Sequence, residues 1–153
     1  MKAEAKTVYP KFWMRFFDAD ADASVGGIEP PTGHFLRFPS SVDGVWFSFV
    51  VTLRKGARLE LYIDRRDESA NDALFGKLKA HKAEIERAVG FALVWHEDET
   101  DEVRRRIDLE IETSGVEDEG EWDKVIAAFR DRMSLFRNAI EGFLGQWERK
   151  SKC

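Results

Sequence analysis

The sequence has a single cysteine, no long apolar run and no surplus of basic residues, and each absence excludes a class of protein. Because the only cysteine is Cys153, no intrachain disulfide can form, and a reducing compartment is expected. The first ten residues lack the apolar core of a secretory signal, and apolar stretches such as residues 45–51 are too short to span a bilayer. We therefore expect a cytoplasmic protein without a membrane segment.

The charge balance limits the kind of partner. Charged residues make up 35% of the chain, but its formal net charge is −5. Proteins held to nucleic acid by bulk charge usually carry a basic surplus, so only a local basic patch would serve that purpose here. With 153 residues, 43% of them hydrophobic, the chain is long enough to bury a core without disulfides. We expect a single domain over residues 1–153, with an ordered core at about residues 8–147.

Helices are predicted where apolar residues recur at intervals of three and four. The segments with this spacing are residues 8–21, 69–89 and 119–147. Ser69 or Asn71 is expected to cap the second helix, and Gly90 to end it. Asp118 and Glu121 resemble a capping pair at the start of the last helix.

Strands are predicted where apolar and polar residues alternate. The alternating segments are residues 45–53, 58–64, 91–95 and 104–112, with a short edge strand at residues 34–38 as a further candidate. Because strands and helices occur in separate groups, the pattern predicts an α+β fold. We expect an antiparallel sheet of four to five strands with three helices mostly on one face, in the order α-β-β-α-β-β-α.

One face of this sheet is the candidate binding site. If the helices cover the other face, the strand period leaves a mixture of charges and aromatic rings exposed, which suits a protein or a nucleic-acid strand. The candidate residues are Trp46, Glu60, Tyr62, Arg104 and Arg106. The competing interpretation is a solvated sheet face with cross-strand ion pairs.

A metal-dependent nuclease is the enzymatic alternative. Asp64, Asp108 and Glu110 lie on neighbouring predicted strands, and converging carboxylates of this kind hold magnesium. The usual lysine is missing, however, because Glu110 is followed by Ile111 and Glu112. We therefore expect no catalytic residues.

Other chemistries lack their sequence signals. The three histidines have no metal-ligand spacing, and the lone cysteine is terminal. There is no glycine-rich phosphate loop and no nucleophile elbow, because Gly26 and Gly27 lead to Pro30 and Pro31 and not into a helix. We expect neither a metal site nor a cofactor.

Short motifs between Phe12 and Phe143 resemble a prokaryotic family, the domain-of-unknown-function family 4268. They include Leu61-Tyr62-Ile63, Asn71, Phe75, Leu78, Lys82, Ile85-Glu86, Gly90, Leu93, Trp95, Arg106-Ile107 and Trp122. That family occurs alone or C-terminal to other domains, some of them restriction-endonuclease-like, and this chain resembles the stand-alone form. The resemblance implies an accessory or recognition module near DNA-handling or defence proteins, and it transfers no catalytic residue.

Three functions follow from these observations. The first is a non-enzymatic binding or accessory module that uses the open sheet face. The second is a divergent nuclease-type enzyme. The third is a self-associating structural protein, a homodimer closed by the apolar stripe of the last helix or by the face that carries Trp46. If Glu86 points inward beside Arg106, the two would form a buried or half-buried ion pair, and such pairs more often fix register than perform chemistry.

Overall fold

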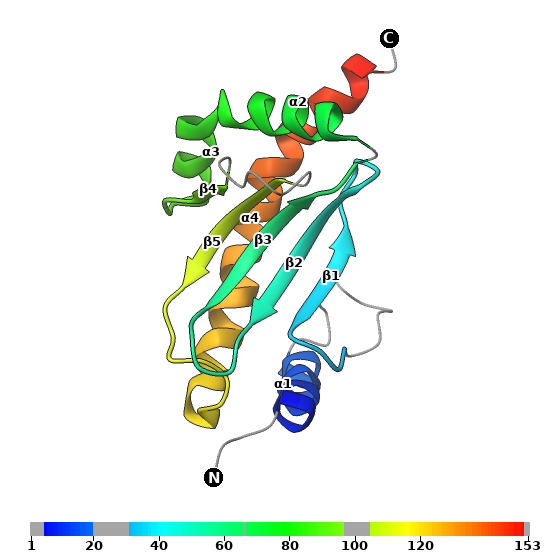
Figure 1. Cartoon of the computed structure of the whole chain (residues 1–153). Helices are drawn as coiled ribbons and strands as arrows, with labels where there is room; N and C mark the ends of the chain where they lie inside the picture. The colour runs from blue at the N-terminus through cyan, green and yellow to red at the C-terminus, as the bar shows by residue number, and fades with distance from the viewer. Residues whose placement is uncertain (1–4, 20–30, 66, 97–104, 152–153) are drawn as a thin grey trace.

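The computed structural model describes residues 5–19, 31–65, 67–96 and 105–151. In this part of the chain a five-stranded antiparallel sheet is combined with four α-helices (Figure 1). The elements are α1 (Ala5–Ala19), β1 (Phe35–Pro39), β2 (Val45–Val51), β3 (Ala57–Ile63), α2 (Glu68–Lys79), α3 (Lys82–Val89), β4 (Val94–His96), β5 (Arg105–Ile111), the 3-10 turn η1 (Glu119–Glu121) and α4 (Trp122–Ser151). Among the described residues, no helix is both long and apolar enough to cross a membrane.

The sheet has the strand order β1-β2-β3-β5-β4, and α4 runs along one of its faces (Figure 1). We call this face the inner face. Here Phe49 of β2 packs against Phe16 of α1 and Phe129 of α4, with ring centroids 5.1 and 5.0 Å apart. The apolar stripe of α4 is therefore buried within the domain, which contradicts the prediction that this stripe closes a homodimer. Of the two predicted dimer surfaces, only the face that carries Trp46 remains.

The predicted second helix is in fact two helices, α2 and α3, so the expected number of three helices is wrong. The chain turns at His81, whose backbone leaves the helical region with φ −108° and ψ 22°. The His81 ring stacks on Phe143 of α4 at a centroid distance of 4.6 Å. Packing against α4 thus overrides the continuous apolar spacing along the sequence. Gly90 ends α3 in the left-handed conformation, with φ 88°, as predicted.

The cap of α2 differs from the prediction. Asp67 is the N-cap residue, because its Oδ1 accepts a hydrogen bond from the backbone N–H of Ala70 at 2.7 Å. Ser69 and Asn71 both lie inside the helix. Asn71 is fully buried, and its Oδ1 accepts a 2.7 Å hydrogen bond from the backbone N–H of Arg65. Asn71 therefore anchors the connection between β3 and α2.

The predicted capping pair before α4 forms only in part. Asp118 accepts a 3.0 Å hydrogen bond from the backbone N–H of Gly120 and so caps η1. Glu121 instead accepts a 2.8 Å hydrogen bond from the hydroxyl of Thr113. The reciprocal bond of a capping box is thus replaced by a link from η1 to the end of β5.

The strands follow the sequence pattern closely, and the candidate edge strand is confirmed as β1. The strand predicted at residues 91–95 is shorter and later than expected, because the backbone N–H of Leu93 donates to the side chain of Glu86 and not to a neighbouring strand. With β1 included and the second helix divided, the observed order is α-β-β-β-α-α-β-β-α.

Candidate functional site

The face of the sheet opposite α1 and α4, which we call the outer face, is lined by polar side chains in cross-strand rows. In one row Trp46 is paired with Tyr62, which is paired with Arg106. In the next row Ser48 is paired with Glu60, which is paired with Asp108. Because paired residues on one face lie side by side, Glu60 and Asp108 place two carboxylates next to each other.

These two carboxylates are buried although no helix covers them. Glu60 is 5% exposed and Asp108 is 3% exposed. Adjacent like charges repel, and burial removes the water that would screen them. A buried acidic pair of this kind is stable only if cations or a proton compensate it.

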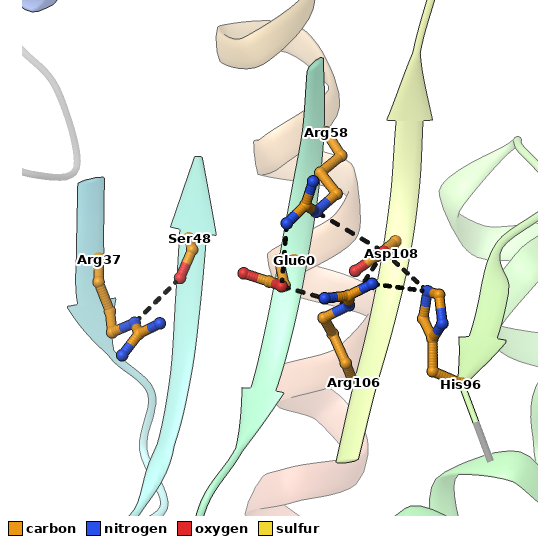
Figure 2. A network of polar contacts seen from close by, with 7 residues as sticks. All are labelled: Arg37, Ser48, Arg58, Glu60, His96, Arg106 and Asp108. Atoms are coloured by element: carbon orange, nitrogen blue, oxygen red, sulfur yellow. Dashed lines mark hydrogen bonds and ion pairs between the residues drawn. The ribbon is translucent and has the colours of Figure 1, made fainter. Parts of the chain in front are cut away.

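Arginines from both strands supply the compensation (Figure 2). Arg106 Nε lies 3.3 Å from Glu60 Oε1 and 3.2 Å from Asp108 Oδ2. Arg58 reaches the same two oxygens, each at 3.7 Å. His96 of β4 adds a contact of 2.9 Å between its Nε2 and Asp108 Oδ2. We call Arg58, Glu60, His96, Arg106 and Asp108 the charge cluster.

The charge cluster shifts the protonation of both acids. Burial raises the pKa of Glu60, the neighbouring Asp108 raises it further, and the arginines oppose the shift. Burial also raises the pKa of Asp108, against the opposing charges of Arg106, His96 and Arg58. Each carboxyl therefore takes up a proton at a higher pH than it would in an unfolded chain.

Hydrogen bonding in the charge cluster is incomplete. Asp108 Oδ1, Arg58 Nε and Arg106 Nε are buried and have no hydrogen-bond partner among the described residues. The contacts of both arginines with the acids are ion pairs to single carboxylate oxygens and not the bidentate fork that guanidinium and carboxylate form at their strongest, and Arg106 also contacts His96 Nε2 at 3.3 Å. The cluster thus balances charge while leaving polar atoms unsatisfied.

Arg37 of β1 lies beside the charge cluster and is held differently (Figure 2). Its Nε donates to Ser48 Oγ at 3.3 Å. Its guanidinium carbon lies 4.4 Å from the ring centroid of Tyr62 and 4.8 Å from that of Phe35. Two cation–π contacts and one hydrogen bond therefore fix the orientation of this arginine.

The predicted site residues fall into three groups. Trp46 and Tyr62 are half-buried neighbours on the outer face. Glu60 and Arg106 lie on the same face but are engaged with each other in the charge cluster. Arg104 lies outside the residues that the structure describes.

Sequence reasoning missed two arginines of this face and the burial of the acids. Arg37 lies on the edge strand that was only a candidate, and Arg58 was not among the candidate residues. The strand period places both correctly, so it was the signal that could have included them. Nothing in the sequence pattern predicted that Asp108 is buried, because its burial depends on the side chains of Arg58 and Arg106, which reach over it.

The acidic triad of the nuclease alternative does not assemble. Asp64 follows β3 four residues after Glu60, which corresponds to about 13 Å along an extended strand. Glu110 is exposed and is paired with Arg58, whereas Asp108 is buried. In the described part of the chain, no group of three histidine, cysteine or acidic side chains is placed to hold a metal ion.

Glu86 and Arg106, considered as a conditional ion pair, have other partners. Glu86 Oε2 accepts hydrogen bonds from the backbone N–H of Leu93 at 2.9 Å and from Trp95 Nε1 at 3.2 Å. Arg106 points to the outer face, where Glu60 and Asp108 occupy it. Glu86 therefore fixes the start of β4 and not the register of β5.

The family of the chain follows from its sequence. Residues 8–144 match the family described as "Domain of unknown function (DUF4268)". The chain belongs to this family. No curated protein and no solved structure matches it. In this DUF4268 domain the matched residues include all five strands and therefore the whole outer face.

Proposed function

We propose that this DUF4268 domain is a non-enzymatic binding or accessory module associated with DNA-handling or defence proteins, a single cytoplasmic domain that binds its partner through the outer face. The observation that carries the proposal is the set of three arginines, Arg37, Arg58 and Arg106, fixed on rigid strands beside two half-exposed aromatic rings. Strands position binding groups more accurately than loops do. Arginine and aromatic residues are also the types that contribute most to binding energy at interfaces.

The burial pattern supports binding over a merely solvated sheet face. A solvated face needs only flexible, exposed ion pairs, which contribute about 0 to 1 kcal/mol each. This face instead buries Glu60 and Asp108, and the cost of desolvating two carboxylates offsets much of the attraction to Arg58 and Arg106. What the arrangement supplies is a set of guanidinium groups whose positions are fixed before a partner arrives.

Photocrosslinking in the native cell tests the proposal. Glu110 is exposed on the outer face and makes no ion pair in the charge cluster, so a photoreactive amino acid there leaves the cluster intact. Leu135 of α4 is 45% exposed and provides a matched control away from the sheet. The proposal predicts a discrete adduct from position 110 and none from position 135. Equal labelling from both positions, or none from either, would refute it.

The same experiment distinguishes the accessory module from the self-associating structural protein. If the adduct from position 110 is a second copy of this chain, the outer face closes a homodimer and the structural-protein hypothesis gains support. An adduct with a different macromolecule supports the accessory-module hypothesis.

A further inference from the structure

Arg37 differs from Arg58 and Arg106 in its electrostatic surroundings, because the charge of Glu60 acts on it from a distance and without a direct ion pair. Its contacts are the Ser48 hydroxyl and the rings of Phe35 and Tyr62, and no acidic side chain among the described residues forms an ion pair with it. The rings hold the guanidinium in place without neutralising it. A fixed guanidinium without a direct ion pair is a preorganised site for an oxyanion.

The surroundings of Arg37 are electropositive despite the acidic total charge of the domain. Arg37, Arg58 and Arg106 are matched on the outer face by Glu60, Asp108 and Glu110, so the described charges of the face balance. The three acids lie on β3 and β5, whereas Arg37 lies on β1. The pKa of His34, just before β1, is lowered first by burial and then by the charges of Arg58 and Arg37, which agrees with a positive local charge on the β1 side of the face.

An aromatic ring lies close enough to serve a ligand bound at Arg37. Trp46 is two residues from Ser48 on β2, a separation of about 7 Å along a strand. Arg37 already covers one face of Tyr62, which leaves the half-buried Trp46 as the stronger candidate for stacking. A sheet face that combines a cation and an aromatic platform fits the phosphates and unstacked bases of a single strand.

Acidic residues restrict the path of such a strand. Trp46 borders a hollow of about 550 Å³ whose lining includes Asp43, Asp64 and Asp67 together with one cation, Arg65. Because acids outnumber the cation there, that side of Trp46 disfavours phosphates, so the backbone would run over Arg37 and the charge cluster. An acidic peptide would use the same arginines but would gain nothing from Trp46.

We propose that the outer face binds single-stranded nucleic acid, with Arg37 contacting a phosphodiester group and Trp46 stacking on a base. This inference rests on the proposed function and adds the chemical class of the partner. With few uncompensated cations, and with a net charge of −5, binding should be weak and strongly dependent on salt.

The test is fluorescence anisotropy with a labelled oligothymidylate of about 12 nucleotides, a length within the site sizes of single-strand binders. Arg37→Ala should weaken binding about tenfold and reduce the salt slope by about one. Arg132→Ala is the control, because Arg132 also stacks on a ring, that of Phe91, and its loss changes the net charge equally. Binding by this control should stay within about twofold of the parent.

Two further variants keep the test decisive. Arg37→Lys retains the charge without the planar fork and should bind between the parent and Arg37→Ala, even if the alanine variant is unstable. Trp46→Leu should lose at least about fivefold through lost stacking.

Failure has a clear form. No binding of the oligonucleotide by the parent, equal effects of Arg37→Ala and Arg132→Ala, or preference for a labelled polyglutamate peptide would each overturn the inference. If the oligonucleotide fails while position 110 still crosslinks selectively to a protein, the proposed function stands and only the ligand class is wrong.

Discussion

Removing Arg106 tests whether the charge cluster is a buried structure or an exposed set of ion pairs. Arg106→Ala deletes the closest arginine to both Glu60 and Asp108 and leaves Arg58 at 3.7 Å from each. Breaking a fully buried ion pair by removing one partner costs about 3 to 5 kcal/mol. Arg106 is itself 35% exposed, so water can enter the space it leaves, and a carboxyl can take up a proton. We therefore expect a loss of about 2 to 3 kcal/mol.

Urea denaturation followed by circular dichroism at neutral pH measures this loss. Arg15→Ala is the matched control, because Arg15 pairs with Asp123 at 2.9 Å on the surface, with side chains 46% and 77% exposed. Its removal should cost at most about 1 kcal/mol. A second substitution, Glu60→Gln, should recover part of the stability in the Arg106→Ala background, since the uncompensated charge disappears.

A loss below about 1 kcal/mol for Arg106→Ala, equal to that of Arg15→Ala, would refute the reasoning. It would mean that the outer face is the open, solvated surface that the strand pattern alone suggests. The arginines would then be mobile, and the argument for a preorganised binding surface would lose its basis.

Three further predictions concern protonation, core packing and backbone conformation. Because burial raises the pKa of Glu60, the stability that this group contributes falls as the pH rises through the raised pKa. Glu60→Gln should therefore stabilise the protein more at about pH 7.5 than at about pH 5. Equal effects of the substitution at the two pH values in urea denaturation would contradict this. Phe129→Ala should destabilise the protein by about 3 to 5 kcal/mol in the same assay, because this fully buried ring of α4 packs against Phe16 of α1 and Phe49 of β2. Gly115→Ala should destabilise the protein by about 2 kcal/mol or more, since at φ 116° a Cβ would lie 2.2 Å from Leu53 O. Gly76→Ala should stabilise it by about 0.5 to 1 kcal/mol, because Gly76 lies inside α2 and a Cβ there meets no atom within 4 Å. Similar melting temperatures for the two variants would count against both expectations.

The strands could be predicted from the sequence because their side chains obey a local rule. Every second residue of β2 and β3 is apolar and faces the core (Val45, Phe47, Phe49 and Val51; Ala57, Leu59, Leu61 and Ile63), and this period is enough to place the strands. Gly90 was predictable for the same reason, since its position after the apolar stripe matches a left-handed helix end.

The division between α2 and α3 could not be predicted, because its cause is distant in the sequence. Residues 69–89 keep the helical spacing of apolar residues through the turn, and the break depends on His81 packing against Phe143 of α4. A local pattern contains no information about that contact. The cap at Asp67 was missed for a simpler reason, since several residues in this segment are good capping types.

The candidate site was predictable in its location but not in its physical state. The strand period places Glu60, Tyr62 and Arg106 on one face, and the structure agrees. The solvent exposure of a side chain depends on the length and direction of its neighbours in space. The strand period alone therefore could not predict that Glu60 and Asp108 are buried beneath arginines.

Structural and binding roles of the charge cluster reinforce each other. Arg58 and Arg106 hold the buried acids, and the acids in turn fix those two guanidinium groups above the sheet. The charges of Arg58 and Arg106 are largely balanced by these acids, whereas Arg37 has no direct ion pair, so an anion gains most by contacting Arg37. A partner that contacts Arg37 therefore need not break an existing ion pair, whereas one that draws Arg106 away must leave Glu60 and Asp108 uncompensated. This difference in cost is why the geometry favours Arg37 as the first contact and the charge cluster as its rigid support.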